Sequence, residues 1–239
     1  MDKKSPLNII PDPRDQTETV TQWVYRTLRD AVMNGTVLPG RALTIRELAA
    51  LLDVSAMPVR EALRLLAAEN ALELLGNRRV IVPEMSAMKF AELCEARIAL
   101  ETHAAARAMP YIDSRRFDDL TELDARIDEA QAEGDLIKIT QLNQQFHRTL
   151  YLANPHDITQ PLIESLWLQL GPFMRLAMAN LADHYIADRH KEALSAIAKS
   201  DAYALKMAIT SDIRDGLAFA ADPHLLQSFV IQSRQDTNA

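Results

Sequence analysis

Residues 44–68 read TIRELAALLDVSAMPVREALRLLAA, and this stretch decides the fold of the first part of the chain. Thr44 and Glu47 have the spacing of a capping box, which predicts a short helix that begins at Thr44 and runs through Leu52. After a short break, Ser55 has the side chain of an N-cap for a second helix, which carries a proline in its first turn. Two helices joined by a turn of about three residues form a helix-turn-helix, whose second helix enters the major groove of DNA.

The second of these helices has one apolar and one polar side. The apolar set consists of Val59, Ala62, Leu63 and Leu66. The side chains that point away from this set are those of Ser55, Met57, Arg60 and Arg64. We expect Arg60 to reach a guanine edge, and Ser55 and Arg46 to contact phosphates. A plain helical hairpin with solvated arginines is the alternative interpretation of the same spacing.

A β-hairpin is predicted directly after these helices. Residues 72–82 read LELLGNRRVIV, in which Gly76-Asn77 separates two β-prone runs. Arg78 and Arg79 lie near the tip of this hairpin, where the wing of a winged helix-turn-helix would meet the DNA backbone or the minor groove. The hairpin therefore favours a winged helix-turn-helix over a plain helical hairpin.

Helical spacing dominates the rest of the chain. It begins at Val20, before the helix-turn-helix, and after Ser86 it continues to about Phe229. Breaks near Pro110, Gly134, Asn154-Pro155, Ser200 and Asp222-Pro223 predict about six helices in this second part. We therefore expect a mainly α fold, with an N-terminal winged helix-turn-helix followed by an all-α helical bundle. The predicted parts are a flexible N-terminal arm at 1–16, the winged helix-turn-helix at 17–85, the helical domain at 86–230 and a flexible tail at 231–239.

The composition is that of an ordinary globular protein. Hydrophobic residues make up 48% of the 239 residues and charged residues 25%. No apolar run reaches the ~18 residues that a membrane-spanning helix requires, and the start of the chain lacks the features of a signal peptide. The single cysteine, Cys94, excludes a disulfide framework. We expect a cytoplasmic protein without membrane contact.

The net charge of −7 is unfavourable for a protein that binds phosphates, but the charge is unevenly distributed. Residues 1–85 contain eleven Lys and Arg against eleven Asp and Glu, whereas residues 86–239 contain fifteen against twenty-two. All of the excess acidity lies in the second part. A neutral first part can still present grouped arginines to DNA, and a dimer doubles that face.

The first part of the chain resembles the DNA-binding domain of GntR-family regulators. The matching runs are LPGRAL at 38–43, RELA at 46–49 and VSAMPVREAL at 54–63, within a resemblance that covers about residues 20–83. It implies that Arg46, Ser55, Met57, Pro58 and Arg60 lie at the DNA surface. Ala56 departs from the pattern, because the family usually carries arginine there, so the preferred operator is expected to differ from the family's common one.

The second part resembles the helical effector domain, named FCD, of the FadR-type branch of that family. The matching pieces, within about residues 88–222, include RIALE at 97–101, AAARA at 104–108, NQQFH at 143–147 and His190. The six-helix count resembles the shorter variant of this domain, and Trp167 before Gly171-Pro172 resembles biofilm and colanic-acid regulators of the branch. The resemblance implies that this part senses a small ligand and forms the dimer.

A metal site is suggested both by residue spacing and by this resemblance. Asn143 and His147 lie at i and i+4, so one helix presents both on one face, and His190 and Asp212 lie on two later helices. In the family the matching positions are usually one Asp and three His, so Asn143 replaces the Asp and Asp212 the third His. A divalent cation such as zinc, nickel or manganese is expected, although an amide oxygen is a weak ligand. Histidines that hydrogen-bond to Asp212 and water without a metal are the alternative.

Arg97 is the candidate for binding the effector. Its guanidinium could hold a carboxylate through two parallel hydrogen bonds, as the resemblance implies for its counterparts. The alternative is an ion pair with Glu101, one helical turn further on, which at a surface stabilises by a few tenths of a kcal/mol.

Together these patterns predict a regulator rather than an enzyme. The expected protein is a homodimer that binds a palindromic operator in double-stranded DNA. It is expected to respond to a small effector, a carboxylate, through differential binding to two states. A metal-dependent enzyme on the helical bundle is an alternative, but no general base, nucleophile or glycine-rich phosphate loop accompanies the four candidate ligands. A regulator with a degenerate effector site is a third possibility.

Overall fold

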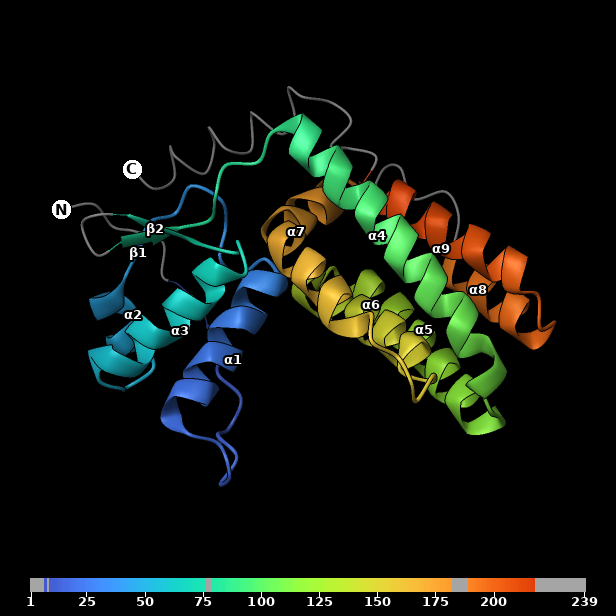
Figure 1. The fold of residues 1–239 in the computed structure, drawn as a ribbon, viewed down its shortest axis with the longest axis horizontal. Coiled ribbons are helices and arrows are strands. Elements are labelled where there is room, and N and C mark those ends of the chain that lie inside the picture. Colours follow the sequence, from blue (N-terminus) through green and yellow to red (C-terminus); the bar gives the residue numbers. More distant parts are fainter. Residues whose placement is uncertain (1–6, 8, 76–78, 182–188, 218–239) are drawn as a thin grey trace. The chain divides into compact units, whose positions relative to one another are not determined.

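The computed structural model describes residues 7, 9–75, 79–181 and 189–217, without the side chains of 174–181 and 217. Within these residues it contains nine α-helices, one short 3₁₀ helix and three short strands, which confirms the expected mainly α fold (Figure 1). The chain divides into two compact units. One contains residues 1–86 together with 167–173 and 222–239, and the other contains 87–166 and 174–221.

The first unit contains the predicted pair of helices and a small sheet. Its elements are α1 (Val20–Met33), β1 (Leu43–Thr44), α2 (Ile45–Leu51), α3 (Ala56–Ala68), β2 (Glu73–Leu75) and β3 (Arg79–Ile81). Helices α1 and α3 pack against each other, and α2 packs against α3. The apolar side chains predicted for α3 are buried, together with Val24 and Leu28 of α1.

The helix starts follow the sequence closely, with two differences. Thr44 is the N-cap of α2, and its hydroxyl accepts a hydrogen bond of 3.1 Å from the amide of Glu47. The Glu47 carboxylate pairs with Arg41 at 3.3 Å, so the predicted reciprocal capping box lacks its return bond. Ser55 occupies the N-cap of α3, but its side chain makes no capping hydrogen bond.

The sheet is antiparallel, with β3 between β1 and β2. The predicted hairpin corresponds to β2 and β3, whereas β1 was not predicted. The register places Thr44 opposite Arg79, and Leu43 opposite Val80. The predicted turn at Gly76-Asn77, together with Arg78, lies outside the described residues.

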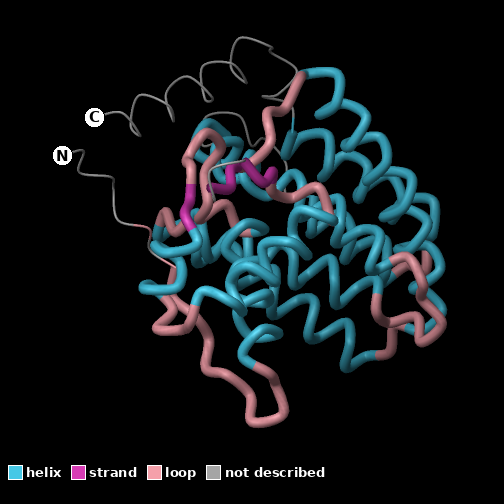
Figure 2. The backbone as a smooth tube through the Cα atoms, turned by 60° about the vertical axis from the view of Figure 1, so that its left-hand side comes forward, coloured by secondary structure: helices cyan, strands magenta, loops and turns pink. Residues whose placement is uncertain are grey.

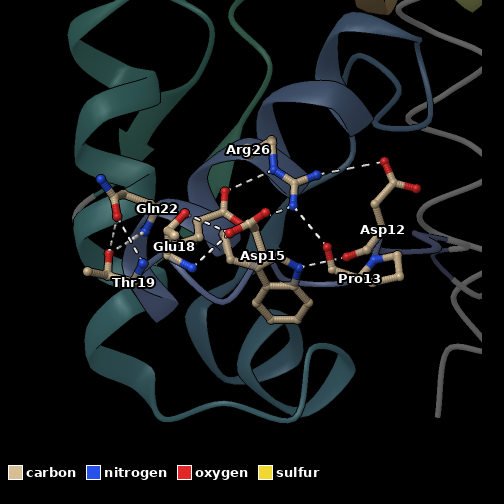
Figure 3. A network of polar contacts seen from close by, with 9 residues as sticks. Asp12, Pro13, Asp15, Glu18, Thr19, Gln22 and Arg26 are labelled. Atoms are coloured by element: carbon tan, nitrogen blue, oxygen red, sulfur yellow. Dashed lines mark hydrogen bonds and ion pairs between the residues drawn. The ribbon is translucent and has the colours of Figure 1, made fainter.

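The segment before α1 makes specific contacts with that helix (Figure 3). The indole Nε1 of Trp23 donates to the carbonyl of Asp12 at 2.8 Å. The guanidinium of Arg26 donates to Glu18 at 2.9 Å and lies 3.7 Å from Asp12. These contacts involve part of the predicted arm, residues 1–16, whose flexibility stays a prediction.

The second unit consists of helices, as Figure 2 shows by the absence of strand colour from its described part. Its elements are α4 (Ala87–Ala108), the 3₁₀ helix η1 (Met109–Tyr111), α5 (Ser114–Glu133), α6 (Leu136–Tyr151), α7 (Gln160–Leu181), α8 (Arg189–Ala198) and α9 (Ala202–Leu217), with the middle of α7 assigned to the first unit. Helix α4 packs on α6 and α9, and α5 packs on α6 and α8. Helices α8 and α9 also pack together.

The helix ends in the second unit match the predicted breaks in the described region. Gly134 ends α5 with a φ of 71°, a left-handed conformation that glycine adopts without strain. Ser200 separates α8 from α9, while the predicted break at Asp222-Pro223 and the tail lie outside the described residues. None of the described helices combines the length and the hydropathy needed to cross a bilayer.

Candidate DNA interface and metal centre

Helix α3 presents the predicted polar side to solvent. Met57 is 64% exposed, as expected for a side chain that points away from the apolar side of the helix. Ser55, Arg60 and Arg64 are exposed as well, and Pro58 is half-buried. The opposite side of the helix forms the core, so these side chains cannot contribute to packing within the unit.

The arginines of the first unit fall into two groups. Arg26, Arg29, Arg41 and Arg64 each pair with a carboxylate. By contrast, Arg14, Arg46, Arg60 and Arg79 are exposed, and none of the four forms an ion pair with another described residue. Residues 1–85 are neutral overall, but four of their arginines have no ion-pair partner among the described residues, and these lie before α1 (Arg14), on α2 (Arg46), on α3 (Arg60) and on β3 (Arg79).

The sheet brings two of these arginines near each other. Because Thr44 pairs with Arg79 across β1 and β3 and is also the N-cap of α2, Arg79 lies beside the helix turn that carries Arg46. Ser55 is the N-cap residue of α3, and its hydroxyl makes no capping hydrogen bond. Arg64 differs from these residues because it forms an ion pair with Glu61 at 3.2 Å. Arg78, the other predicted wing arginine, lies outside the described residues.

In the second unit, three ligand-type side chains from three helices meet in the interior. The ligand atoms of His147 on α6, His190 on α8 and Asp212 on α9 all lie within 4.8 Å of one another, and all three residues are buried. His147 Nε2 is 3.1 Å from Asp212 Oδ2, and His190 Nε2 is 3.8 Å from Asp212 Oδ1. The amide Nδ2 of Asn143 lies 3.2 Å from His190 Nε2. The structure thus brings together all four residues that the sequence selected as metal ligands.

Both histidines have a partner at the ring nitrogen that points away from Asp212. The Nδ1 of His147 lies 3.0 Å from the hydroxyl of Tyr151, and the Nδ1 of His190 lies 3.6 Å from Asp124 Oδ1. Such outer partners orient histidines that bind metals through the other nitrogen. The Tyr151 hydroxyl donates to Glu101 Oε2 at 2.9 Å.

Arg97 belongs to the same buried network. Its Nε donates to Glu101 Oε1 at 2.6 Å, so the pairing that the sequence left open is present, and it is buried instead of exposed. The charge and the hydrogen bond of Glu101 raise the pKa of Arg97 although burial lowers it. Nothing in these contacts tests a role of Arg97 in effector binding, which stays a prediction.

The ionisation of the neighbouring groups follows from burial and charge. Burial raises the pKa of Asp212, but its hydrogen bond with His147 and the charges of His190, His147 and Arg97 lower it to about 2. Burial and Glu101 raise the pKa of Tyr151 well above its ordinary value. Asp212 is therefore a carboxylate at neutral pH, and Tyr151 keeps its proton.

The buried carboxylates in the described part of this interior outnumber the buried guanidinium groups. Among the described residues, the buried carboxylates are those of Glu101, Asp124 and Asp212, and the buried guanidinium is that of Arg97. Asp212 faces the imidazoles of His147 and His190, Asp124 faces that of His190, and Arg97 pairs with Glu101. Two imidazole nitrogens and a carboxylate oxygen within 4.8 Å of one another are ligands that a divalent cation such as zinc takes, so the residues present fit such an ion.

Sequence reasoning missed Tyr151 and Asp124. Tyr151 follows His147 by four residues on α6, so helical spacing alone could have indicated their contact. Asp124 lies on α5 and meets His190 only through the packing of α5 on α8. No local pattern in the sequence marks that second contact.

Comparison with known proteins gives two family matches. The model of bacterial regulatory proteins of the gntR family matches residues 20–82, and the model of the FCD domain matches residues 92–215. The HTH-type transcriptional regulator McbR of Escherichia coli K12 is 32% identical over 154 residues, which are 64% of this chain and 70% of McbR. The gluconate operon transcriptional repressor of Bacillus subtilis 168 is 27% identical over 180 residues, with 73% and 74% covered.

Solved structures agree with these matches. The structure of E. coli McbR/YncC superposes with a TM-score of 0.79 at 27% identity, covering 89% of this chain and 99% of that one. The structure of a GntR transcriptional regulator from Rhodococcus sp. RHA1 superposes with a TM-score of 0.67 at 27% identity, covering 84% and 96%.

Proposed function

The chain belongs to the gntR family of bacterial regulatory proteins and carries an FCD domain, and from this membership we propose that it is a homodimer whose affinity for a palindromic DNA operator is changed by a small effector. The relatives described above are transcriptional regulators and not enzymes, and this chain is a regulator of the same kind. The cytoplasm is the compartment in which such a protein meets the chromosome.

The observation that supports DNA binding is that the helix-turn-helix and its sheet present three exposed guanidiniums, on Arg46, Arg60 and Arg79, which form no ion pair with any described residue. Helix α3 enters the major groove, where Arg60 contacts a guanine edge and Met57 and Pro58 lie against the base pairs or sugars. Arg46 and Ser55 bind phosphates, and the wing residues Arg78 and Arg79 contact the backbone or the minor groove. Two such units in a dimer read half-sites about 34 Å apart.

The observation that supports the metal is the buried cluster of His147, His190 and Asp212, whose ligand atoms lie within 4.8 Å of one another. A divalent cation, with zinc, nickel or manganese as candidates, is held by His147, His190 and Asp212, with the amide oxygen of Asn143 as a fourth ligand after rotation of that amide. When bound, the ion supplies an electrophilic centre to which an anionic effector can be attracted.

The proposed effector is a small carboxylate. A buried cation and Arg97 are both groups that bind carboxylates, and one similar protein is named for an operon of gluconate, itself a carboxylate. The effector acts by binding more tightly to one of two dimer geometries, because a ligand can shift an equilibrium only by its differential affinity. As in the gluconate operon repressor, the proposed outcome of operator binding is repression.

Replacing Arg60 by alanine tests the groove assignment. We expect Arg60→Ala to lose about 1–3 kcal/mol of discrimination for the operator over bulk DNA, because the guanidinium has no structural partner to lose. The measurement is binding to operator fragments selected from random DNA, at two salt concentrations. Arg126→Ala is the matched control, because Arg126 is an exposed arginine on α5 of the second unit. Equal discrimination by parent and Arg60→Ala would exclude the groove assignment.

Replacing His147 by alanine tests the metal. We expect purified parent protein to contain about one divalent ion per chain, and His147→Ala to contain little, since the variant loses one of the two nitrogen ligands. Elemental analysis of both proteins makes the measurement. His103→Ala, at an exposed position of α4, should keep the ion. Metal content that does not differ between parent and His147→Ala contradicts the site.

A further inference from the structure

Arg41 and Glu47 form an ion pair beside two of the arginines that are proposed to bind DNA. We infer that Arg41 is a positioning residue for DNA binding, which holds the Glu47 carboxylate so that Arg46 and Arg79 stay available to the duplex. The inference rests on the DNA binding proposed above. It assigns Arg41 no contact with DNA of its own.

The position of Glu47 follows from the hydrogen bond that caps α2. The amide of Glu47 donates to the hydroxyl of Thr44 at 3.1 Å, and Thr44 lies opposite Arg79 across β1 and β3. Side chains of directly opposite residues in an antiparallel pair lie on the same face of the sheet, with Cβ atoms about 5 Å apart. The side chain of Arg79 therefore begins beside the hydroxyl that binds the Glu47 amide. Glu47 also follows Arg46 directly in the chain.

A carboxylate at this position opposes DNA binding unless another group neutralises it. The side chain of Glu47 is 29% exposed, so its charge acts on the surface that Arg46 and Arg79 present. It can pair with Arg79, or it can repel a phosphate that approaches either arginine, and both effects weaken binding. In the structure Glu47 Oε1 lies 3.3 Å from Arg41 Nη2. Among the described residues, neither Arg46 nor Arg79 forms an ion pair with Glu47.

Arg41 is suited to hold this carboxylate and poorly suited to contact DNA. Its side chain is 16% exposed, whereas Arg46 and Arg79 are exposed residues. Its Nε is buried without a hydrogen-bond partner in the described structure, and an unsatisfied buried N–H opposes folding. The pair with Glu47 is therefore poorly optimised for stability. We expect its loss to affect DNA affinity more than folding.

A double-mutant cycle of Arg41→Met, Glu47→Gln and the variant with both changes tests the inference. The probe is an operator fragment that the parent selects from random DNA. We expect Arg41→Met to bind it about three- to fivefold more weakly, because the Glu47 charge is released toward Arg46 and Arg79. In the Glu47→Gln background, the same arginine substitution should change affinity by less than about twofold.

Arg148→Met is the matched control, because it removes one positive charge and one partly exposed ion pair from the second unit. It should leave the affinity for the operator fragment at the parent's value. The midpoint of urea unfolding should shift no more in Arg41→Met than in Arg148→Met. A purely structural role of Arg41 predicts a larger shift, and Glu47→Gln would not restore DNA affinity in that case.

The outcomes separate the roles that Arg41 can have. An equal loss of affinity in both backgrounds means that Arg41 contacts DNA itself, and it overturns the inference. Unchanged affinity in Arg41→Met also overturns the inference, while the parent's selection of an operator leaves the proposed function intact. If the parent selects no sequence, the proposed function and the inference both fail. If circular dichroism shows that Arg41→Met is unfolded, Glu47→Gln alone decides. Affinity at or above the parent's value then supports the inference, and weaker binding overturns it.

Discussion

Arg97 and Glu101 lie one helical turn apart on α4, and burial changes what their pairing contributes. On an exposed helix such a pair stabilises the helix by a few tenths of a kcal/mol, which is the contribution expected above if the pair lay at the surface. Here the side chains are 7% and 0% exposed. Removing one partner therefore leaves a charge in the interior without its counterion, and that loss is much larger than the pair's net contribution.

At the residue scale, we expect Arg97→Met to lower the free energy of unfolding by about 3 kcal/mol, because Glu101 loses its counterion in the interior. Urea denaturation at neutral pH makes the measurement. Arg148→Met is the control, because the Arg148–Glu164 pair is partly exposed and should cost less than about 1 kcal/mol. Similar losses in the two variants would show that burial does not govern the Arg97–Glu101 pair.

The candidate metal site shows how far single residues can be predicted from sequence. Asn143 and His147 were predicted from i, i+4 spacing, and His190 and Asp212 from their place on later helices and from the family resemblance. Asp124 was not predicted, because its contact with His190 depends on how α5 packs against α8. Helical spacing reports neighbours on one helix and gives no information on which face of another helix they meet.

At the scale of elements, the helices were predictable because their caps and apolar stripes are local. The predicted pair at 44–68 corresponds to α2 and α3, with the first helix ending at Leu51. Strand β1 was missed because two residues are too few for any alternation to be visible. It becomes a strand only because β3 offers free backbone groups beside it.

The packing of α1 on α3 includes a titratable contact. Tyr25 on α1 donates a hydrogen bond to Glu69, the C-cap of α3, and Arg29 lies 3.8 Å from the same carboxylate. Burial and Glu69 raise the pKa of Tyr25 from 10.0 to about 12. A raised folded-state pKa contributes stability that is fully present below the unfolded value and is lost as pH rises through the folded value.

We therefore expect the parent to lose stability between about pH 10 and about pH 12, and Tyr25→Phe to lack this component, because phenylalanine cannot ionise. Denaturant unfolding at several pH values across this window makes the measurement. Tyr203→Phe should retain the parent's slope, since that side chain is exposed. A parent and a Tyr25→Phe variant with the same slope would contradict the assignment.

At the scale of the whole molecule, the charge distribution explains how an acidic protein can bind DNA. The net charge of −7 resides in residues 86–239, and the first 85 residues are neutral. Within the described part of the first unit, carboxylates pair with Arg26, Arg29 and Arg41, whereas Arg14, Arg46, Arg60 and Arg79 form no ion pair. The acidic part repels phosphates, so the field of the protein favours encounters that begin at the arginine-bearing unit.

The pairing of Thr44 with Arg79 has a mechanical consequence for recognition. Since the residue that caps α2 is also a strand residue of the sheet, a tilt of the hairpin must carry the start of α2 with it. The backbone spacing between Arg79 and Arg46 is thereby held constant. If both arginines bind phosphates, as proposed above for Arg46 and as one alternative for Arg79, a duplex with a different phosphate spacing would have to deform, so its stiffness and groove width would affect binding at base pairs that no side chain contacts.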